Sequence, residues 1–337
     1  MLSNTVLLAD GKTKKCSVLD YYNQILNPDG DVANIIDKKI KKDVDVYEIK
    51  PKTGKPFYVT EDTIIPFYCN GEKIRAAFKE IVSLKDDKLI AKKSFKIAHN
   101  KSINFMNNIS LPISPRLFGY ILCNTSSTTG TVRITLNEKD SPGIEYKKFV
   151  EKYINENGLM LSKVKGQPDN TNSYQIINKE KNIKKKNPLY TLLEEFGLAR
   201  TKVPDRFIPD MYKVASESER LELLASICDT SGYINGNSYQ LLLSSEQLAN
   251  DIAFVARTLG LTASVNKVIK SKKEYFNITI GGDVWKIPCL VKKKKMAMPN
   301  SRKDLLIRNF DIKYLGKQTI VEIKVDDDYL LDDCTIL

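Results

Sequence analysis

Leu117 to Thr125 (LFGYILCNT) and Leu224 to Gly232 (LASICDTSG) are two apolar stretches that look like diverged copies of one short motif. Each combines large apolar residues with small ones, Gly119 in the first copy and Ala225 and Ser226 in the second. This composition is typical of a helix that packs closely against another helix. A single copy would fit any ordinary helix pair, and a duplication is indicated only by the elements that follow both stretches.

The same order of predicted elements follows both motifs. A polar turn (SSTTG or GYINGN) leads into an alternating run typical of a strand, and then into a helical run that stops at a glycine. Two more strand-like runs follow each helix. The sequence therefore predicts an internal repeat, with one αββαββ unit per copy at about 112–198 and 217–300. The predicted strands are 131–136 and 238–244, and the predicted helices are 144–158 and 245–260.

The two stretches resemble the LAGLIDADG motif of homing endonucleases, in which two apolar helices cross and each ends in a metal-binding carboxylate. This resemblance implies two lobes, each with a four-stranded antiparallel sheet, that together form a saddle in the major groove of DNA. The family's acids fall on Asn124 and Ser231 here. Neither side chain carries the negative charge that hard divalent cations require, so we expect a DNA-binding fold without nuclease chemistry. Asp229 remains near the second motif's end, where we expect a cap or a buried polar contact.

Basic residues outnumber acidic ones, and the surplus is concentrated near the predicted repeat. The chain has 53 Lys and Arg against 41 Asp and Glu, a formal net charge of +12. Such a surplus favours polyanion partners, above all double-stranded DNA, because neutralised phosphates release counterions. Any one lysine cluster alone would fit a solvated surface. The resemblance also implies that Arg206, and a lysine among 292–295, lie beside the scissile phosphate. The predicted DNA-binding residues are Arg133, Lys184, Lys185, Lys186, Arg206, Lys270, Lys272, Lys273, Lys292, Lys293, Lys294 and Lys295.

The two ends of the chain carry a second resemblance. Residues Leu2 to Leu19 resemble the opening of an intein, a self-splicing element, and residues 315–337 resemble its closing strands. In inteins these segments pair into one all-β Hint domain, and a LAGLIDADG endonuclease is often inserted between them. We therefore expect an α+β chain with a split all-β Hint-like domain at 1–105 plus 306–337, and a duplicated LAGLIDADG-like DNA-binding domain at 110–300.

Self-splicing requires groups that this sequence lacks at the matching positions. An intein begins with a Cys or Ser nucleophile, where this sequence has Met1, and ends in His-Asn, where it has Leu337. Thr63 replaces the histidine that polarises the first scissile bond, and a threonine hydroxyl is no general acid near neutral pH. Thr60 and Glu322 match family positions, and we expect them to be remnants of the splicing centre.

Cysteine and histidine usage excludes several other classes of site. Six scattered cysteines without a C-x-x-C pair disfavour a zinc site or a disulfide framework and indicate a reducing compartment. The single histidine, His99, has no partner at ligand or triad spacing, so histidine-based nucleophilic catalysis is not expected. The sequence shows no signal peptide and no apolar run of membrane length, and we expect an intracellular protein of the cytoplasm or nucleus. A monomer is the simplest state because the repeat supplies both lobes.

The sequence leaves three functions open. The first is a degenerate intein and homing-endonuclease relative that binds double-stranded DNA without cutting or splicing, and without a cofactor. The second is an active intein-encoded endonuclease, seen in an inactivated form, which would need Mg²⁺. The third is a protein-interaction or structural module with a protein partner. A polar, basic saddle would favour DNA, whereas a broad apolar one would favour a protein.

Overall fold

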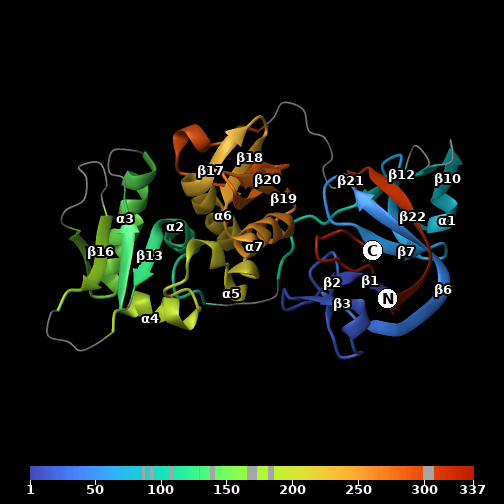
Figure 1. Ribbon diagram of the computed structural model, residues 1–337, viewed down its shortest axis with the longest axis horizontal. Coiled ribbons are helices and arrows are strands. Elements are labelled where there is room, and N and C mark those ends of the chain that lie inside the picture. Colours follow the sequence, from blue (N-terminus) through green and yellow to red (C-terminus); the bar gives the residue numbers. More distant parts are fainter. Residues whose placement is uncertain are drawn as a thin grey trace. The chain divides into compact units, whose positions relative to one another are not determined.

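The structure, a computed structural model, describes residues 1–85, 88–91, 95–105, 110–128, 130–136, 141–164, 173–180, 186–298 and 307–337. The chain forms two compact units, whose elements are labelled in Figure 1. The terminal unit comprises Met1–Asn108, Ala256–Ser264 and Pro299–Leu337, and the central unit comprises Ile109–Val255 and Val265–Met298. Residues 256–264 lie within the predicted second repeat and include the end of one of its helices and the start of one of its strands, but they are grouped with the terminal unit.

Strands from both ends of the chain share one sheet of the terminal unit. The first sheet has the order β1-β22-β6-β7, and the second has the order β21-β12-β8-β9. β6 and β22 pair antiparallel along most of their length, and β1 joins β22 in parallel. The bounds are β1 Leu2–Ser3, β6 Ile35–Pro51, β7 Phe57–Thr60, β8 Ile64–Cys69, β9 Glu72–Ala77, β12 Phe95–Ala98, β21 Ile307–Arg308 and β22 Phe310–Val325.

Short elements and an apolar core complete the terminal unit. Buried side chains from both sheets, among them Ile49, Val59 and Phe67, form one cluster with Phe78 of the short helix that follows β9. Their burial supplies the main free energy that holds the two ends of the chain together. The remaining elements are β2 Thr5–Leu7, β3 Thr13–Lys15, η1 Cys16–Val18, β4 Ile25–Leu26, β5 Val32–Ala33, α1 Phe78–Ile81, β10 Val82–Lys85 and β11 Lys88–Ala91.

The central unit contains two four-stranded sheets with the same arrangement. The first repeat has the strand order β13-β14-β16-β15, and the second has β17-β18-β20-β19. The first repeat comprises α2 Pro115–Asn124, β13 Thr125–Thr128, β14 Thr131–Thr135, α3 Ser141–Glu156, β15 Leu159–Lys163, β16 Ser173–Asn178 and α4 Pro188–Glu195. The second comprises α6 Glu217–Ser231, β17 Gly232–Asn235, β18 Ser238–Leu243, α7 Glu246–Thr258, β19 Thr262–Lys270 and β20 Lys273–Gly281. Short helical turns lie between and after them at η2 Val203–Asp205, α5 Asp210–Lys213, η3 Val284–Lys286 and η4 Lys292–Lys294.

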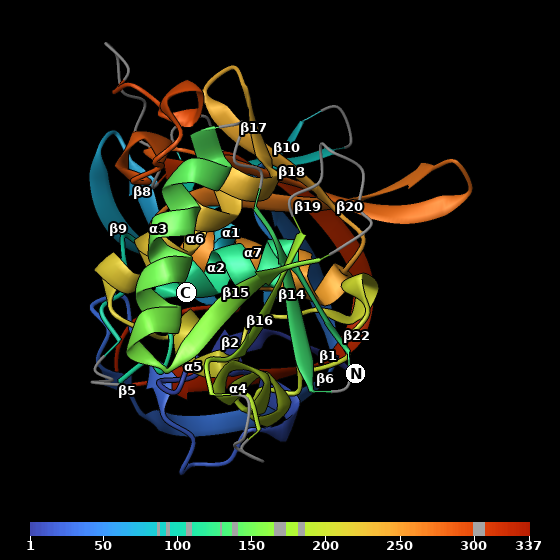
Figure 2. The same ribbon diagram turned by 90° about the vertical axis from the view of Figure 1, so that its left-hand side faces the viewer.

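Local signals in the sequence account for these elements. Val132 and Ile134 of β14 are buried, and so are Tyr239 and Leu241 of β18, so each sheet turns alternate side chains into the core. Helix α3 lies alongside β15 (Figure 2). Helix α6 begins with a capping box, in which the Ser216 side chain accepts a hydrogen bond from the Glu219 amide and Glu219 accepts one in return. None of the helices in the described ranges is long and apolar enough to cross a membrane.

The two motif helices, α2 and α6, pack directly against each other at their small residues. A Cβ atom on Gly119 would overlap the Ser226 hydroxyl and lie 2.9 Å from the Leu223 carbonyl oxygen. The second of these atoms is backbone and cannot rotate away. The spacing between the helices therefore requires a residue without a side chain at position 119, as the motif predicted.

We expect Gly119→Ala to lower the free energy of unfolding of the central unit by about 1–3 kcal/mol, because overpacking forces α2 and α6 apart. Urea unfolding followed by circular dichroism measures the change. Adding Ser226→Ala should recover part of the loss, since it removes the overlapping hydroxyl. An unchanged midpoint for Gly119→Ala would show that the helices are not in this contact.

Candidate functional site

The two positions that resemble lost metal-binding acids lie at the carboxyl-terminal ends of α2 and α6. The Asn124 side chain donates a hydrogen bond to the Tyr120 carbonyl oxygen, at 3.3 Å. The Ser231 hydroxyl interacts with the thiol of Cys123, a residue of the opposite helix whose pKa is raised by burial. Both polar groups are therefore engaged in local contacts at the helix ends.

A basic residue caps each of these helix ends. Arg206 is buried, and its guanidinium donates to the carbonyl oxygens of Leu122, at 2.6 Å, and Thr125. Lys294 Nζ donates to the carbonyl oxygens of Cys228, at 3.1 Å, and Asp229, at 2.5 Å. Such cations complement the partial negative charge at a helix carboxyl terminus.

The sequence predicted that Arg206, and a lysine among 292–295, contact a DNA phosphate. In the structure Arg206 and Lys294 instead bond to carbonyl oxygens within the protein. Burial lowers the pKa of both Arg206 and Lys294. A divalent metal ion does not fit here. The side chains that would have to coordinate it are an amide and a hydroxyl, and each helix end is already bonded to a basic side chain. Among the described residues no group of three or more His, Cys, Asp or Glu side chains could hold a metal.

Asp229 anchors the segment that carries Lys294. Its fully buried carboxylate accepts hydrogen bonds from the Tyr146 hydroxyl, at 2.9 Å, and from the backbone amides of Leu290, at 2.8 Å, and Val291, at 3.2 Å. Burial and the nearby Asp229 carboxylate both raise the pKa of Tyr146, so its hydroxyl remains a donor at neutral pH. The contacts of Asp229 are those of a buried polar anchor.

The outward face of the first sheet is polar. Val132 and Ile134 point into the core, so Arg133 between them points outward and is exposed. Arg133 lies opposite Gln175 of β16, which lies opposite Ser162 of β15. Directly opposed residues share one face of a sheet, so these three side chains form a row across the strands.

The outward face of the second sheet has an equivalent row. Gln240 of β18 lies between buried Tyr239 and Leu241, and it is opposite Tyr233 of β17 and Thr279 of β20. Outward positions of the described strands carry hydroxyl, amide, basic and a few apolar side chains and no Asp or Glu. They include Thr131, Thr135, Met160, Ser173 and Ile177 in the first sheet and Asn235, Ser238, Leu242, Tyr275 and Asn277 in the second.

Lysines extend this surface at the turn between β19 and β20. The two strands form a hairpin that reaches beyond the others of its sheet (Figure 2). Ser271 and Lys272 at the turn have positive φ angles of 47° and 62°. Lys270, Lys272 and Lys273 are all exposed. The hairpin therefore presents three lysines to solvent, and its one acidic residue, Glu274, pairs with Lys267 at 2.7 Å.

The remaining predicted DNA-binding lysines lie elsewhere in the central unit. Lys292, Lys293 and Lys295 are exposed around the short turn η4. Lys186 is exposed and lies 3.4 Å from a carboxylate oxygen of Glu194. Lys184 and Lys185 lie outside the described residues. Sequence reasoning missed the outward amides and hydroxyls, which only the strand register places on one face.

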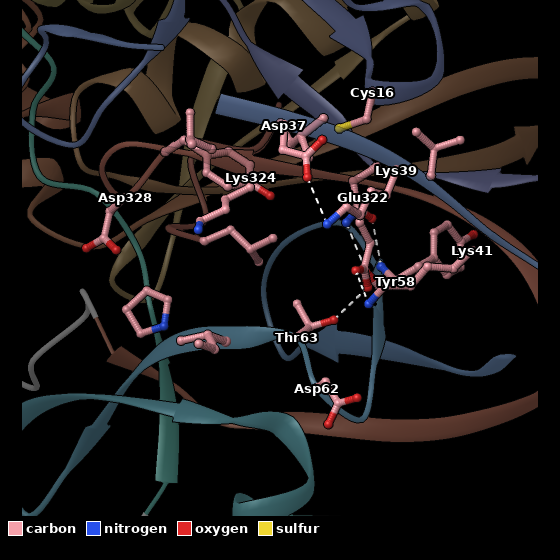
Figure 3. A pocket seen from close by; sticks show the side chains of 18 of the residues that line it. Cys16, Asp37, Lys39, Lys41, Tyr58, Asp62, Thr63, Glu322, Lys324 and Asp328 are labelled. Carbon is pink, nitrogen blue, oxygen red and sulfur yellow. Dashed lines mark hydrogen bonds and ion pairs between the residues drawn. The ribbon is translucent and has the colours of Figure 1, made fainter. Parts of the chain in front are cut away.

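A separate pocket of about 400 Å³ lies in the terminal unit (Figure 3). One oxygen of Glu322 accepts hydrogen bonds from the hydroxyls of Thr60 and Thr63, each at 2.8 Å. The other oxygen lies 2.5 Å from Lys41 Nζ. Cys16 also lines the pocket, but burial raises the pKa of its thiol to about 12. Because the thiolate is the nucleophilic form, Cys16 is unreactive near neutral pH.

His99 is fully enclosed within the terminal unit. Its Nδ1 lies 2.9 Å from the Asn100 carbonyl oxygen, and its Nε2 lies 3.0 Å from the carbonyl oxygen of Asp333 in the closing segment. Burial, with the positive charge of Arg308, lowers the pKa of His99 to about 3. The imidazole is therefore neutral at physiological pH, and its single N–H donates to one of these two carbonyl oxygens and not to both.

No family model matches this chain, and no curated protein matches it. Among solved structures, mesophilic variants of the homing endonuclease I-DmoI are similar over 51% of this chain and 83% of theirs, at 12% identity and a TM-score of 0.38. I-DmoI in complex with DNA and Ca matches over 51% and 83%, at 11% identity and a TM-score of 0.35. The N-terminal LAGLIDADG domain of DUF199/WhiA matches over 58% and 88%, at 7% identity and a TM-score of 0.30. At these low identities the similarity concerns the backbone fold alone.

We expect acid to destabilise the terminal unit through His99. Between pH 6.5 and 3 the unfolded histidine binds a proton that the buried one does not, so the free energy of unfolding falls as the pH is lowered. The contribution is at most about 1.4 kcal/mol per pH unit. Urea unfolding of the wild type and His99→Gln across this range tests it. The wild type should lose more stability than the variant, and a difference independent of pH would contradict the assignment.

Proposed function

We propose that the central unit is a LAGLIDADG-like, duplicated DNA-binding domain that binds double-stranded DNA through the outward faces of its two sheets. The observation that carries this proposal is the absence of Asp and Glu from the described outward positions of both sheets, whose strands carry rows of amide, hydroxyl and basic side chains. Such groups donate to phosphates and to base edges, and a carboxylate on these faces would repel the phosphate backbone.

The composition of these faces supports DNA over a protein partner. Protein interfaces centre on a desolvated patch of apolar and aromatic residues. Here the exposed apolar side chains are few, with Met160 38% exposed in one sheet and Tyr233 50% exposed in the other. The exposed lysines of the β19–β20 hairpin add the charge that phosphate contact requires. Since one chain supplies both sheets, a monomer suffices.

We also propose that this unit binds DNA without cutting it. Hydrolysis with two metal ions needs carboxylates that hold the cations against the scissile phosphate. Asn124 and Ser231 supply none, and Arg206 and Lys294 keep positive charge within one turn of both helix ends. These cations stabilise the helix ends at the place where a metal would have to be drawn from water.

The terminal unit is, in this proposal, a Hint-like domain without splicing activity. Thr60, Thr63 and Lys41 all bond to one carboxylate, that of Glu322. The two threonine hydroxyls and the lysine ammonium are thereby engaged in contacts within the protein. The cluster connects β6, β7 and β22, and its role is structural.

Restoring both acids should not restore cleavage. In the double variant Asn124→Asp and Ser231→Asp, we expect the new carboxylates to pair with the fixed cations and not with Mg²⁺. Incubation with duplex DNA and Mg²⁺, followed by a denaturing gel, should show intact strands for the variant and the wild type. Magnesium-dependent nicking by either protein would contradict the proposal and support an endonuclease.

Reversing charge on the hairpin should weaken DNA binding. We expect the triple variant Lys270→Glu, Lys272→Glu and Lys273→Glu to bind a random-sequence duplex at least tenfold more weakly than the wild type, because three phosphate contacts become repulsive. Fluorescence anisotropy at low salt measures the affinity.

A matched control variant distinguishes the effect of local contacts on DNA affinity from the effect of net charge. Lys15, Lys42 and Lys50 are exposed lysines of the terminal unit, and reversing them changes the net charge equally. This control should retain most of the affinity. Equal losses in the two triple variants would mean that attraction to DNA is unspecific and would count against the sheet faces.

A further inference from the structure

Arg133 and Gln240 occupy equivalent positions in the two repeats. Each lies on the second strand of its sheet, opposite the second residue of the first strand, Ser126 for Arg133 and Tyr233 for Gln240. Each lies between two buried residues and points to the outward face. The repeat therefore presents two non-identical side chains, an arginine and a glutamine, at one site of a duplicated surface.

The carboxamide of Gln240 is held by its neighbour. The Tyr233 hydroxyl donates a hydrogen bond to Gln240 Oε1, with an O···O distance of 2.6 Å. Tyr233 is half-exposed, so this contact lies on the outward surface and not in the core. Thr279, the opposite residue on β20, completes the row. The tyrosine thus takes one of the two lone pairs of Gln240 Oε1 and holds this oxygen toward β17, so the two N–H donors point away from that bond.

We infer that Arg133 and Gln240 are equivalent base-reading residues of the two half-sites, and that Tyr233 orients the Gln240 carboxamide so that it favours guanine over adenine. This inference rests on the proposed function. A free glutamine binds adenine bidentately, because it accepts from N6 and donates to N7. With one lone pair of Oε1 engaged and the oxygen held toward Tyr233, Gln240 presents its N–H donors to a base more readily than its oxygen, and guanine, with N7 and O6 both acceptors, is the base that suits those donors best.

Arg133 has the same preference for a different reason. A guanidinium carries only donors, and its commonest specific partner is guanine N7 and O6. The two half-sites should therefore both favour guanine at the equivalent base, although one is read by an arginine and the other by a glutamine. Tyr233 is a positioning residue, and Gln240 is the residue that contacts the base.

The test is a selection of bound duplexes from a random-sequence pool, with base preferences obtained by sequencing. The wild type should show two positions that favour guanine. Tyr233→Phe frees Oε1 while keeping the ring, and we expect it to raise the preference for adenine over guanine at one position by roughly fivefold or more. Gln240→Ala should abolish the preference at that position and leave the one due to Arg133.

Tyr275→Phe is the matched control, because Tyr275 is a tyrosine on the same outward face of β20. It should leave both preferences unchanged. Duplex binding with an unchanged preference in Tyr233→Phe would overturn the inference and leave the proposed function intact. A wild type that binds no duplex at low salt would overturn both. An adenine gain in Tyr233→Phe without one in Tyr275→Phe is the supporting result.

Discussion

The close crossing of α2 and α6 is the constraint on which the central unit depends. Gly119 allows the helices to approach until the position of a Cβ is filled by Ser226 and by the Leu223 backbone. A short-range contact of this kind fixes both helices, and β13 and β17 begin directly where α2 and α6 end. The helix packing therefore determines where the first strand of each sheet begins, and the other strands of the sheet pair onto that strand.

The charge at the carboxyl-terminal ends of α2 and α6 determines whether a metal ion could bind there. A helix carboxyl terminus concentrates unpaired carbonyl groups, which need donors or cations. In this chain Arg206 and Lys294 fill that need from within the protein. Metal-dependent chemistry at the same place would require acidic side chains in excess of the cations. Here the carbonyl groups at both helix ends are satisfied by cations of the chain itself.

Much of the fold could be predicted from local patterns, whereas the contacts at the site could not. The strand at 131–136 and the helices at 144–158 and 245–260 correspond to β14, α3 and α7, because alternation and glycine stops are local signals. The motif pair also indicated a helix contact with small residues. The hydrogen bond between Tyr146 and Asp229 joins residues 83 positions apart, so no local sequence pattern predicts it. Arg206 was expected to contact phosphate because sequence gives its charge but not its burial.

The salt dependence of duplex binding is the measurement that decides whether the central unit binds DNA through charged and polar groups of its sheets. Affinity for a random-sequence duplex would be measured by anisotropy from low to physiological salt. If the lysines, arginine and polar rows of the two sheets contact the backbone, the logarithm of the affinity constant should fall linearly with the logarithm of salt concentration, with a slope that corresponds to several phosphates. Absence of binding at low salt, or an affinity independent of salt, would contradict the account.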